Sequence, residues 1–189
     1  CYLCLKACTT GAFAGPYLLD ARRCISYVTI ELKGWIPRHL RPLIGNHIFG
    51  CDICQEVCPY NSKPEASSES SYAPRAGLHA PQLIALLSLD QDEFRRRFKA
   101  SPILRAKRRG LLRNVAVALG NCKSLDAVPA LIGALDDEEP LVRGHAAGGW
   151  VADRVVPPKD HGKRPRGVHV RDGLRDLVKG LLDVARDRE

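Results

Sequence analysis

Methionine is absent from the 189-residue sequence, and no run of apolar residues is long enough to cross a membrane. The first residues also lack the basic and apolar pattern of a secretion signal. Disorder is not expected, since 45% of the residues are apolar and 26% are charged, as in ordinary globular proteins. A chain without methionine that begins inside a cysteine cluster is expected to be part of a longer protein. We predict a cytoplasmic monomer that does not associate with a membrane.

Cysteine is scarce over most of the chain and concentrated at its beginning. Seven of the eight cysteines lie in the first 58 residues, whereas Cys122 stands alone and is predicted to be a small buried apolar residue. A secreted disulfide scaffold would be short and rich in cysteine throughout. The uneven distribution therefore favours a reducing compartment and cysteines that bind metal.

The spacing of the cysteines indicates iron–sulfur clusters. The bacterial ferredoxin run is C-x2-C-x2-C-x3-C-P, and the last cysteine of each run binds the other cluster. The intervals C-x2-C-x3-C occur twice, in Cys1, Cys4 and Cys8 and again in Cys51, Cys54 and Cys58, the second time followed by Pro59. Two copies of one spacing are stronger evidence than either copy alone.

Two 4Fe-4S clusters need eight thiolates. The second run has Ile48 in place of its first cysteine, and Cys24 is the only cysteine between the two runs. The first cysteine of the first run would lie three residues before Cys1. The predicted partition gives cluster one this upstream cysteine with Cys1, Cys4 and Cys58, and gives cluster two Cys8, Cys24, Cys51 and Cys54.

A zinc site is the alternative interpretation. The pairs Cys1–Cys4 and Cys51–Cys54 could supply four thiolates to one tetrahedral zinc ion. This arrangement leaves the other three early cysteines unexplained, and the gap between the pairs is longer than in the usual zinc ribbons. Iron–sulfur ligation is therefore the favoured interpretation.

The sequence around these cysteines resembles epoxyqueuosine reductase. LDARRCISYVTIELK at 19–33 and IGNHIFGCDICQEVCPYN at 44–61 carry the resemblance, which is strong over about residues 1–61 and looser beyond them. It implies an oxidoreductase of queuosine synthesis that acts on epoxyqueuosine in the anticodon stem-loop of a tRNA. It also implies two 4Fe-4S clusters, cobalamin and an external electron donor. One departure is Thr9, where the family usually has proline.

The resemblance implies roles for individual residues. Cys24 is the cluster ligand that ferredoxins lack, and Ser26, Lys33, Cys51 and Asp52 lie near the cobalamin. Without the resemblance, Ser26 and Lys33 would be interpreted as an exposed helix face. Most of the cobalamin site and the catalytic acid would lie upstream of Cys1. We therefore expect no catalytic residue in this chain, and the chain alone is expected to be inactive.

The expected fold is mainly α, with a ferredoxin-like two-cluster segment followed by HEAT-like helical repeats. LLRNVAVALG at 111–120 aligns with LVRGHAAGGW at 141–150 at an offset of 30 residues, which is typical of paired-helix repeats. Asp20 and Asp90 are predicted to cap helices. The expected segments are a 4Fe-4S domain at 1–60, a polar linker at 61–77, helical repeats at 78–155, and a basic irregular stretch with a terminal amphipathic helix at 156–189.

Excess positive charge is confined to one segment. Residues 91–113 carry nine basic and two acidic side chains, which is most of the net charge of +8. A phosphate backbone would relieve the repulsion within such a cluster, although a solvated helix face is the alternative. The predicted tRNA contacts are Arg95, Arg96, Arg97, Lys99, Arg105, Lys107, Arg108, Arg109, Arg113 and Arg143.

The favoured function is the electron-delivering and tRNA-binding part of an epoxyqueuosine reductase. One alternative is a stand-alone two-cluster electron carrier in which the repeats dock another protein. A second is a HEAT-type adaptor whose cysteine region is structural.

Overall fold

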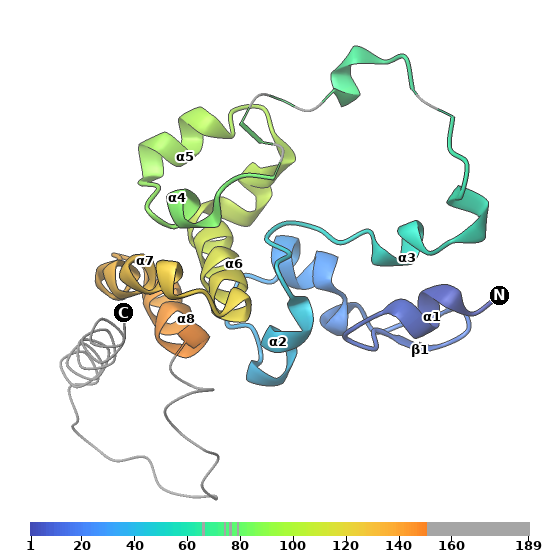
Figure 1. The fold of residues 1–189 in the computed structure, drawn as a ribbon, viewed down its shortest axis with the longest axis horizontal. Helices are drawn as coiled ribbons and strands as arrows, with labels where there is room; N and C mark the ends of the chain where they lie inside the picture. The colour runs from blue at the N-terminus through green and yellow to red at the C-terminus, as the bar shows by residue number, and fades with distance from the viewer. Residues whose placement is uncertain (66, 74, 76, 79, 151–189) are drawn as a thin grey trace, which may run out of the picture.

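The computed structural model describes residues 1–65, 67–73, 75, 77, 78 and 80–150 (Figure 1). This part of the chain is mainly helical, as predicted, with a cysteine-rich segment of short elements joined to a body of longer helices. The predicted irregular stretch and terminal helix at 156–189 lie outside the described residues. Within the described part, no helix has the length and apolar character needed to span a membrane.

Short elements build the cysteine-rich segment. They are α1 (Leu3–Ala7), β1 (Phe13–Gly15), β2 (Leu18–Leu19), the 3-10 turn η1 (Ala21–Arg23), the π-helix η2 (Tyr27–Glu31), η3 (Arg38–Leu40), α2 (Arg41–Ile44), α3 (Ile53–Glu56) and η4 (Pro59–Asn61). The two strands form an antiparallel hairpin. Helices α1 and α3 pack against each other although about 50 residues separate them in sequence, and Figure 1 shows them side by side.

The stretch after Asp20 contains two short helical elements in place of the one helix that Asp20 was predicted to cap. Asp20 does act as a cap, since its carboxylate accepts the Arg22 amide proton at 3.1 Å, but the capped element is the short 3-10 turn η1. The backbone is extended at Cys24, and helical geometry resumes with the π-helix η2. Cys24 therefore lies between two helical turns and not on the first turn of one helix. Single π turns are frequent at functional sites.

The helical body follows a mostly exposed connection that contains η5 (Ser70–Tyr72). Its elements are α4 (Leu83–Leu87), α5 (Gln91–Arg97), η6 (Pro102–Ala106), α6 (Lys107–Cys122), η7 (Leu125–Ala127), α7 (Val128–Gly133), η8 (Ala134–Asp136) and α8 (Pro140–Trp150). The predicted cap at Asp90 is confirmed, because its carboxylate accepts the Glu93 amide proton at 2.7 Å at the start of α5. Cys122 is exposed at the end of α6, so its predicted burial is wrong.

The aligned decapeptides fall on α6 and α8, which pack against each other. Ala116 and Ala146 occupy equivalent repeat positions and lie buried in one apolar core formed by α4 to α8. α8 continues through Gly144, Gly148 and Gly149, although glycine lowers the stability of a helix interior. Gly144 lets the Trp35 ring lie where a Cβ atom would be, and that ring stacks on His145 with centroids 5.0 Å apart.

A second buried cluster joins the cysteine-rich segment to the helical body. Its members are Ile25, Val28, Ile36, Leu40 and Ile44 together with Val117 of α6, and Cys51 packs against them. Asn121, one turn further along α6, donates to the carbonyls of Arg41 and Gly45 at 2.8 and 2.7 Å. The cysteine-rich segment is thus anchored on α6 by both apolar and polar contacts.

Candidate iron–sulfur site and basic face

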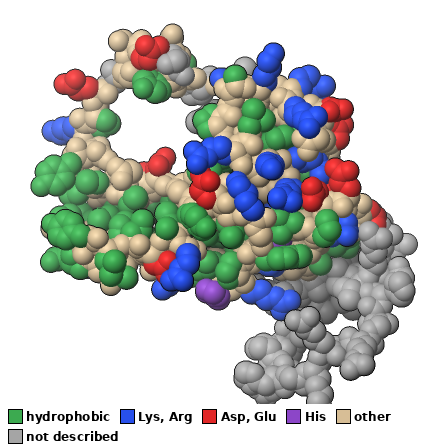
Figure 2. Space-filling model, turned by 180° about the vertical axis from the view of Figure 1, so that it is seen from behind, with side chains coloured by type: hydrophobic (Ala, Val, Ile, Leu, Met, Phe, Trp, Pro, Cys, Tyr) green, Lys and Arg blue, Asp and Glu red, His purple; other side chains and the backbone are tan. Residues whose placement is uncertain are grey.

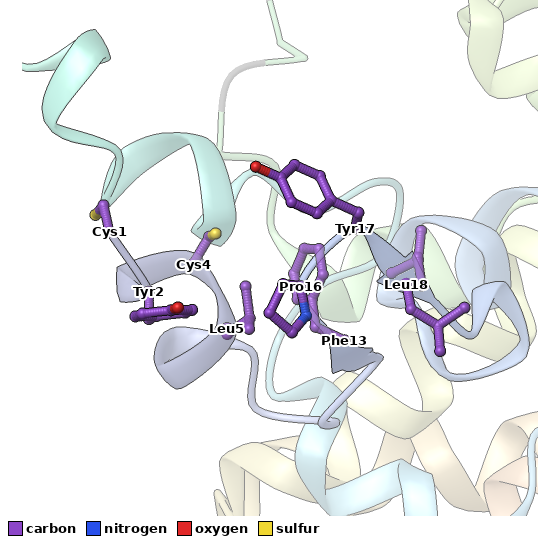
Figure 3. Close-up of a pocket in the computed structure, with 9 residues that line it drawn as sticks. Cys1, Tyr2, Cys4, Leu5, Phe13, Pro16, Tyr17 and Leu18 are labelled. Atoms are coloured by element: carbon purple, nitrogen blue, oxygen red, sulfur yellow. The ribbon is translucent and has the colours of Figure 1, made fainter.

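The packing of α1 against α3 brings the two cysteine runs together. Cys1, Cys4 and Cys8 flank or lie in α1, and Cys51, Cys54 and Cys58 flank or lie in α3. All seven early cysteines are free thiols, and six of them are half-buried while Cys1 is exposed. Figure 3 shows the sulfur atoms of Cys1 and Cys4 on the side of α1 that lies near α3.

A cavity of about 510 Å³ opens beside Cys1 and Cys4. Tyr2, Leu5 and the residues of the β1–β2 hairpin complete its largely apolar wall, with Tyr17 at the tip of the hairpin (Figure 3). The cavity borders two thiols and is open to solvent, since Tyr2, Tyr17 and Leu18 in its wall are exposed. The role of Cys1 and Cys4 as ligands to a 4Fe-4S cluster stays a prediction.

Cys8 is placed to act as a thiolate. Its sulfur accepts the Ala12 amide proton at 3.3 Å and lies 3.5 Å from the Thr10 hydroxyl. Burial acts to raise the pKa of the Cys8 thiol. The Thr10 hydroxyl and the amides of Ala12, Thr10 and Phe13 outweigh that effect, so the pKa is lowered overall. Donors aimed at sulfur are a recognised means of stabilising cluster ligands.

Cys51 has three other cysteines as electrostatic neighbours. Burial raises the pKa of its thiol, and Cys24, Cys54 and Cys8 raise it further through like-charge repulsion between the thiolates. These are the four cysteines predicted for cluster two. A cation bound among these thiols would favour their ionised form, as the iron of a cluster does for its ligands.

The zinc alternative requires thiols gathered around a single ion. Among the residues that the structure describes, no group of three or more His, Cys, Asp or Glu side chains is close enough to hold one metal ion. A 4Fe-4S cubane places its four irons between the ligands, so its cysteines stand farther apart than those of a mononuclear site. The absence of a mononuclear ligand group among the described residues therefore does not count against a 4Fe-4S cluster.

The residues expected near cobalamin have contacts of their own. The Ser26 hydroxyl donates to the Cys51 carbonyl at 3.2 Å, and Asp52 is exposed just before α3. Lys33 is exposed, but its ammonium donates to the carbonyls of Ile30 and Arg105 at 3.0 and 2.8 Å. Ser26, Cys51 and Asp52 thus lie together, whereas Lys33 is held against η6.

The basic segment forms an exposed face of the helical body. Figure 2 shows Lys and Arg side chains gathered there, next to a mainly hydrophobic surface over the cysteine-rich segment. The exposed or half-exposed members of the predicted set are Arg95, Arg96, Arg97, Lys99, Arg105, Lys107, Arg109 and Arg143. Arg95 and Arg96 make only exposed ion pairs within α5, at 3.8 and 3.6 Å, and such pairs contribute little to stability. A phosphate can therefore compete for them.

Two arginines in the predicted tRNA set are buried, and their assignment is wrong. Arg108 is 8% exposed and forms a bidentate ion pair with Asp137 at 2.6 and 3.1 Å. Arg113 is 1% exposed and donates to main-chain carbonyls of the cysteine-rich segment. Both face inward on α6, because the helix is covered on nearly all sides, and neither can reach a phosphate.

The polar residues that join the two cysteine-bearing segments were not among the predicted site residues. Thr29 donates its hydroxyl to the Ile25 carbonyl at 2.7 Å and accepts the Gly50 amide proton at 3.0 Å. Asn114 donates to the carbonyls of Thr29 and Ile48, both at 2.8 Å. The signal was present in the sequence, since an Arg–Asn pair inside the apolar run LLRNVAVAL indicates buried polar contacts.

Residues 1–61 match the family model described as a 4Fe-4S double cluster binding domain. The cysteine-rich segment is thus placed in the class of double-cluster iron–sulfur domains, here continued by a helical body. Two similar curated proteins are the epoxyqueuosine reductases of Escherichia coli K12, 45% identical over 147 residues, and of Pseudomonas aeruginosa, 48% identical over 146 residues. These alignments cover 78% and 77% of this chain but only 39% and 40% of the relatives.

Solved structures agree with the sequence comparison. The crystal structure of epoxyqueuosine reductase with an epoxyqueuosine-modified tRNA-Tyr stem loop matches with a TM-score of 0.75 and 36% identity, over 79% of this chain and 40% of that one. The Streptococcus thermophilus epoxyqueuosine reductase matches with a TM-score of 0.72 and 28% identity, over 97% of this chain and 50% of that one. The chain is a homologue of the epoxyqueuosine reductases, and it spans about 39% of the length of the curated relatives.

Proposed function

We propose that this chain is the electron-delivering and tRNA-binding part of a cytoplasmic epoxyqueuosine reductase. The homology supports the reaction class, which is reduction of epoxyqueuosine to queuosine in tRNA. The packing of α1 against α3 is the observation that carries the proposal, because it brings together the cysteine runs 1–8 and 51–58, which a two-cluster redox site needs side by side.

The cysteines divide the proposed electron path into an outer and an inner site. Cys1, Cys4 and Cys58 hold the cluster nearer to solvent, where an external donor can reach it, and the other four hold the cluster that rests on the helical body. Ser26, Cys51, Asp52 and Lys33 are proposed to face a cobalamin on the far side of that cluster. When bound, the clusters supply one-electron transfer and the cobalamin supplies reducing cobalt chemistry.

Cluster loading tests the proposed ligands. The full chain, reconstituted anaerobically with iron and sulfide, is expected to absorb broadly in the visible region and to show an EPR signal on reduction. Cys24→Ser should remove the signal of cluster two, because it leaves three thiolates for that cluster. Cys122→Ser is the matched control and should change nothing, since Cys122 is an exposed cysteine at the end of α6. Equal iron content in the two variants would contradict the assignment.

The basic face is proposed to bind the backbone of the tRNA stem-loop. The support is the exposed cluster on α5 and η6 together with the relative solved with a tRNA stem loop. Phosphate contacts fix position and carry no sequence information, so they should show as a salt-dependent affinity.

Charge reversal at Arg95, Arg96 and Lys99 tests this face. Each lost phosphate contact should reduce the slope of log K against log salt by about 0.9 or less, depending on whether the contact is to a duplex or a single strand. Lys123→Glu, an exposed cation beyond the end of α6, is the control and should leave the slope unchanged. An unchanged slope in the triple variant would refute the binding face.

A further inference from the structure

The environment of Arg113 is unusual for a buried cation. Its side chain is fully enclosed, and its guanidinium has five N–H groups. Nε and one Nη2 proton donate to the Asn114 side-chain oxygen at 3.0 and 2.8 Å. The remaining three donate to the carbonyls of Leu32, Gly34 and Val28 at 2.7, 2.7 and 2.8 Å. Every acceptor is a neutral oxygen, so these hydrogen bonds satisfy the donors and leave the positive charge uncompensated.

A buried charge without a counter-ion is expensive to desolvate. Burial, with a smaller contribution from Arg109, lowers the pKa of Arg113 to about 10, so the group still carries its proton at neutral pH. The protein therefore maintains a permanent positive charge inside the junction between α6 and the cysteine-rich segment.

The Arg113 guanidinium borders the segments that bear Cys24 and Cys51, two of the proposed cluster-two ligands. Val28, which accepts from Arg113, donates its own amide proton to the Cys24 carbonyl at 2.9 Å. Val117, one turn after Arg113 on α6, belongs to the apolar cluster against which Cys51 packs. Cys24 is thus linked to Arg113 through the main chain, and Cys51 through buried apolar side chains, and a charge acts over a longer range in such a buried environment than in water.

Asn114 fixes both the charge and the ligand segments in place. Its oxygen accepts two protons from Arg113, and its amide group donates to Thr29 and Ile48, so its hydrogen-bonding capacity is fully used. Thr29 in turn bridges the residue after Cys24 and the residue before Cys51. The distance between the two ligand segments is therefore set by α6.

We propose that Arg113, oriented by Asn114, is a positioning residue whose buried charge raises the reduction potential of cluster two and so directs electrons inward from cluster one. The inference rests on the proposed function. A 4Fe-4S cluster with four thiolates becomes more negative on reduction, and a nearby cation favours the reduced form. One electron is transferred from cluster one, supplied by a low-potential one-electron donor, to cluster two. No bond forms or breaks, and no proton moves.

A redox titration of the reconstituted full chain, followed by EPR with dithionite as the donor, tests the proposal. All four proposed ligands of cluster two lie in this chain, so its midpoint potential can be measured directly. Arg113→Gln should shift that potential to a more negative value, while Arg113→Lys, which keeps the charge, should not. Asn114→Asp places a carboxylate against the guanidinium and should also lower the potential. Lys123→Gln is the matched surface control and should have no effect.

The outcomes distinguish failure of this inference from failure of the proposed function. If the unmodified chain binds no cluster two, the proposed function fails. If it does bind, an unchanged potential in Arg113→Gln overturns the inference alone, and so does an equal shift in Arg113→Lys. If Arg113→Gln loses iron, the potentials of the other two variants test the inference. An unchanged potential in Asn114→Asp, or a shifted potential in Arg113→Lys, then overturns it. Loss of cluster two in all three variants would make the role structural and would overturn the proposal.

Discussion

The buried ion pair between Arg108 and Asp137 should contribute far more to the stability of the helical body than the exposed pair between Arg108 and Glu138. The two side chains are 9% and 7% exposed, and Arg108 also donates to the Leu89 carbonyl at 2.7 Å. Asp137→Ala leaves the guanidinium buried without its carboxylate, which costs about 3–5 kcal/mol of unfolding free energy. For a chain of this length, that corresponds to a fall in Tm of roughly 10 °C.

Glu138 provides a matched control on the same arginine. Its carboxylate lies 3.5 Å from Arg108 but is 74% exposed, so Glu138→Gln should change the unfolding free energy by less than about 1 kcal/mol. Urea denaturation of both variants measures the difference. Replacing both partners by apolar residues, Arg108→Met with Asp137→Leu, should recover much of the loss, because no charge is then left unpaired. Equal stability of the Asp137 and Glu138 variants would refute the reasoning.

Further tests concern the packing of α8. Gly144→Ala should destabilise the protein by about 1–3 kcal/mol, because the new methyl group meets the rigid Trp35 ring, whereas Gly133→Ala, with open space around it, should be neutral or stabilising by up to about 1 kcal/mol. A urea series in which Gly144→Ala matched Gly133→Ala would contradict this packing. His145 is buried with Nδ1 donating to the Leu141 carbonyl and Nε2 accepting the Ile36 amide proton, and burial lowers its pKa to about 4. Below about pH 6.5 the unfolded chain binds a proton at His145, whereas the folded chain does not bind it until about pH 4. The unfolding free energy should therefore fall between pH 6.5 and 4 by on the order of 3 kcal/mol. His145→Gln should flatten this part of the pH profile, and an unaltered slope would show that another group is responsible.

The 4Fe-4S character of the cysteine-rich segment could be predicted because its information is local, and the family model that matches residues 1–61 agrees with it. Intervals of two and three residues indicate the cluster type, whereas the assignment of single thiols to each cluster, including Cys24 in place of a cysteine at Ile48, stays a prediction. The comparisons confirmed the resemblance to epoxyqueuosine reductase. The π-helix after Cys24 could not be predicted, since it depends on carbonyls that Arg113 and Asn114 satisfy from a helix far along the chain.

The basic face was only partly predictable because a charge count does not distinguish the two sides of a helix. Arg108 and Arg113 counted equally with Lys107 and Arg109 in the sequence, although the first two are buried. The aligned repeat also suggested that Arg113 and Arg143 share one role. In the structure Arg113 contacts the cysteine-rich segment, whereas Arg143 donates to the Asp137 and Glu138 carbonyls just before its own helix.

The polar contacts of α6 have a consequence for how the chain folds. Arg113, Asn114 and Asn121 together donate to seven carbonyl groups between residues 28 and 48. The match to the family model ends at residue 61, but the unit that folds cooperatively therefore extends beyond it. Loss of the helical body would expose those carbonyls and the apolar surface around Val28 at once. The cysteine-rich segment and α6 should unfold in a single transition, and a redox module transplanted without α6 would lose the backbone that spaces its ligands.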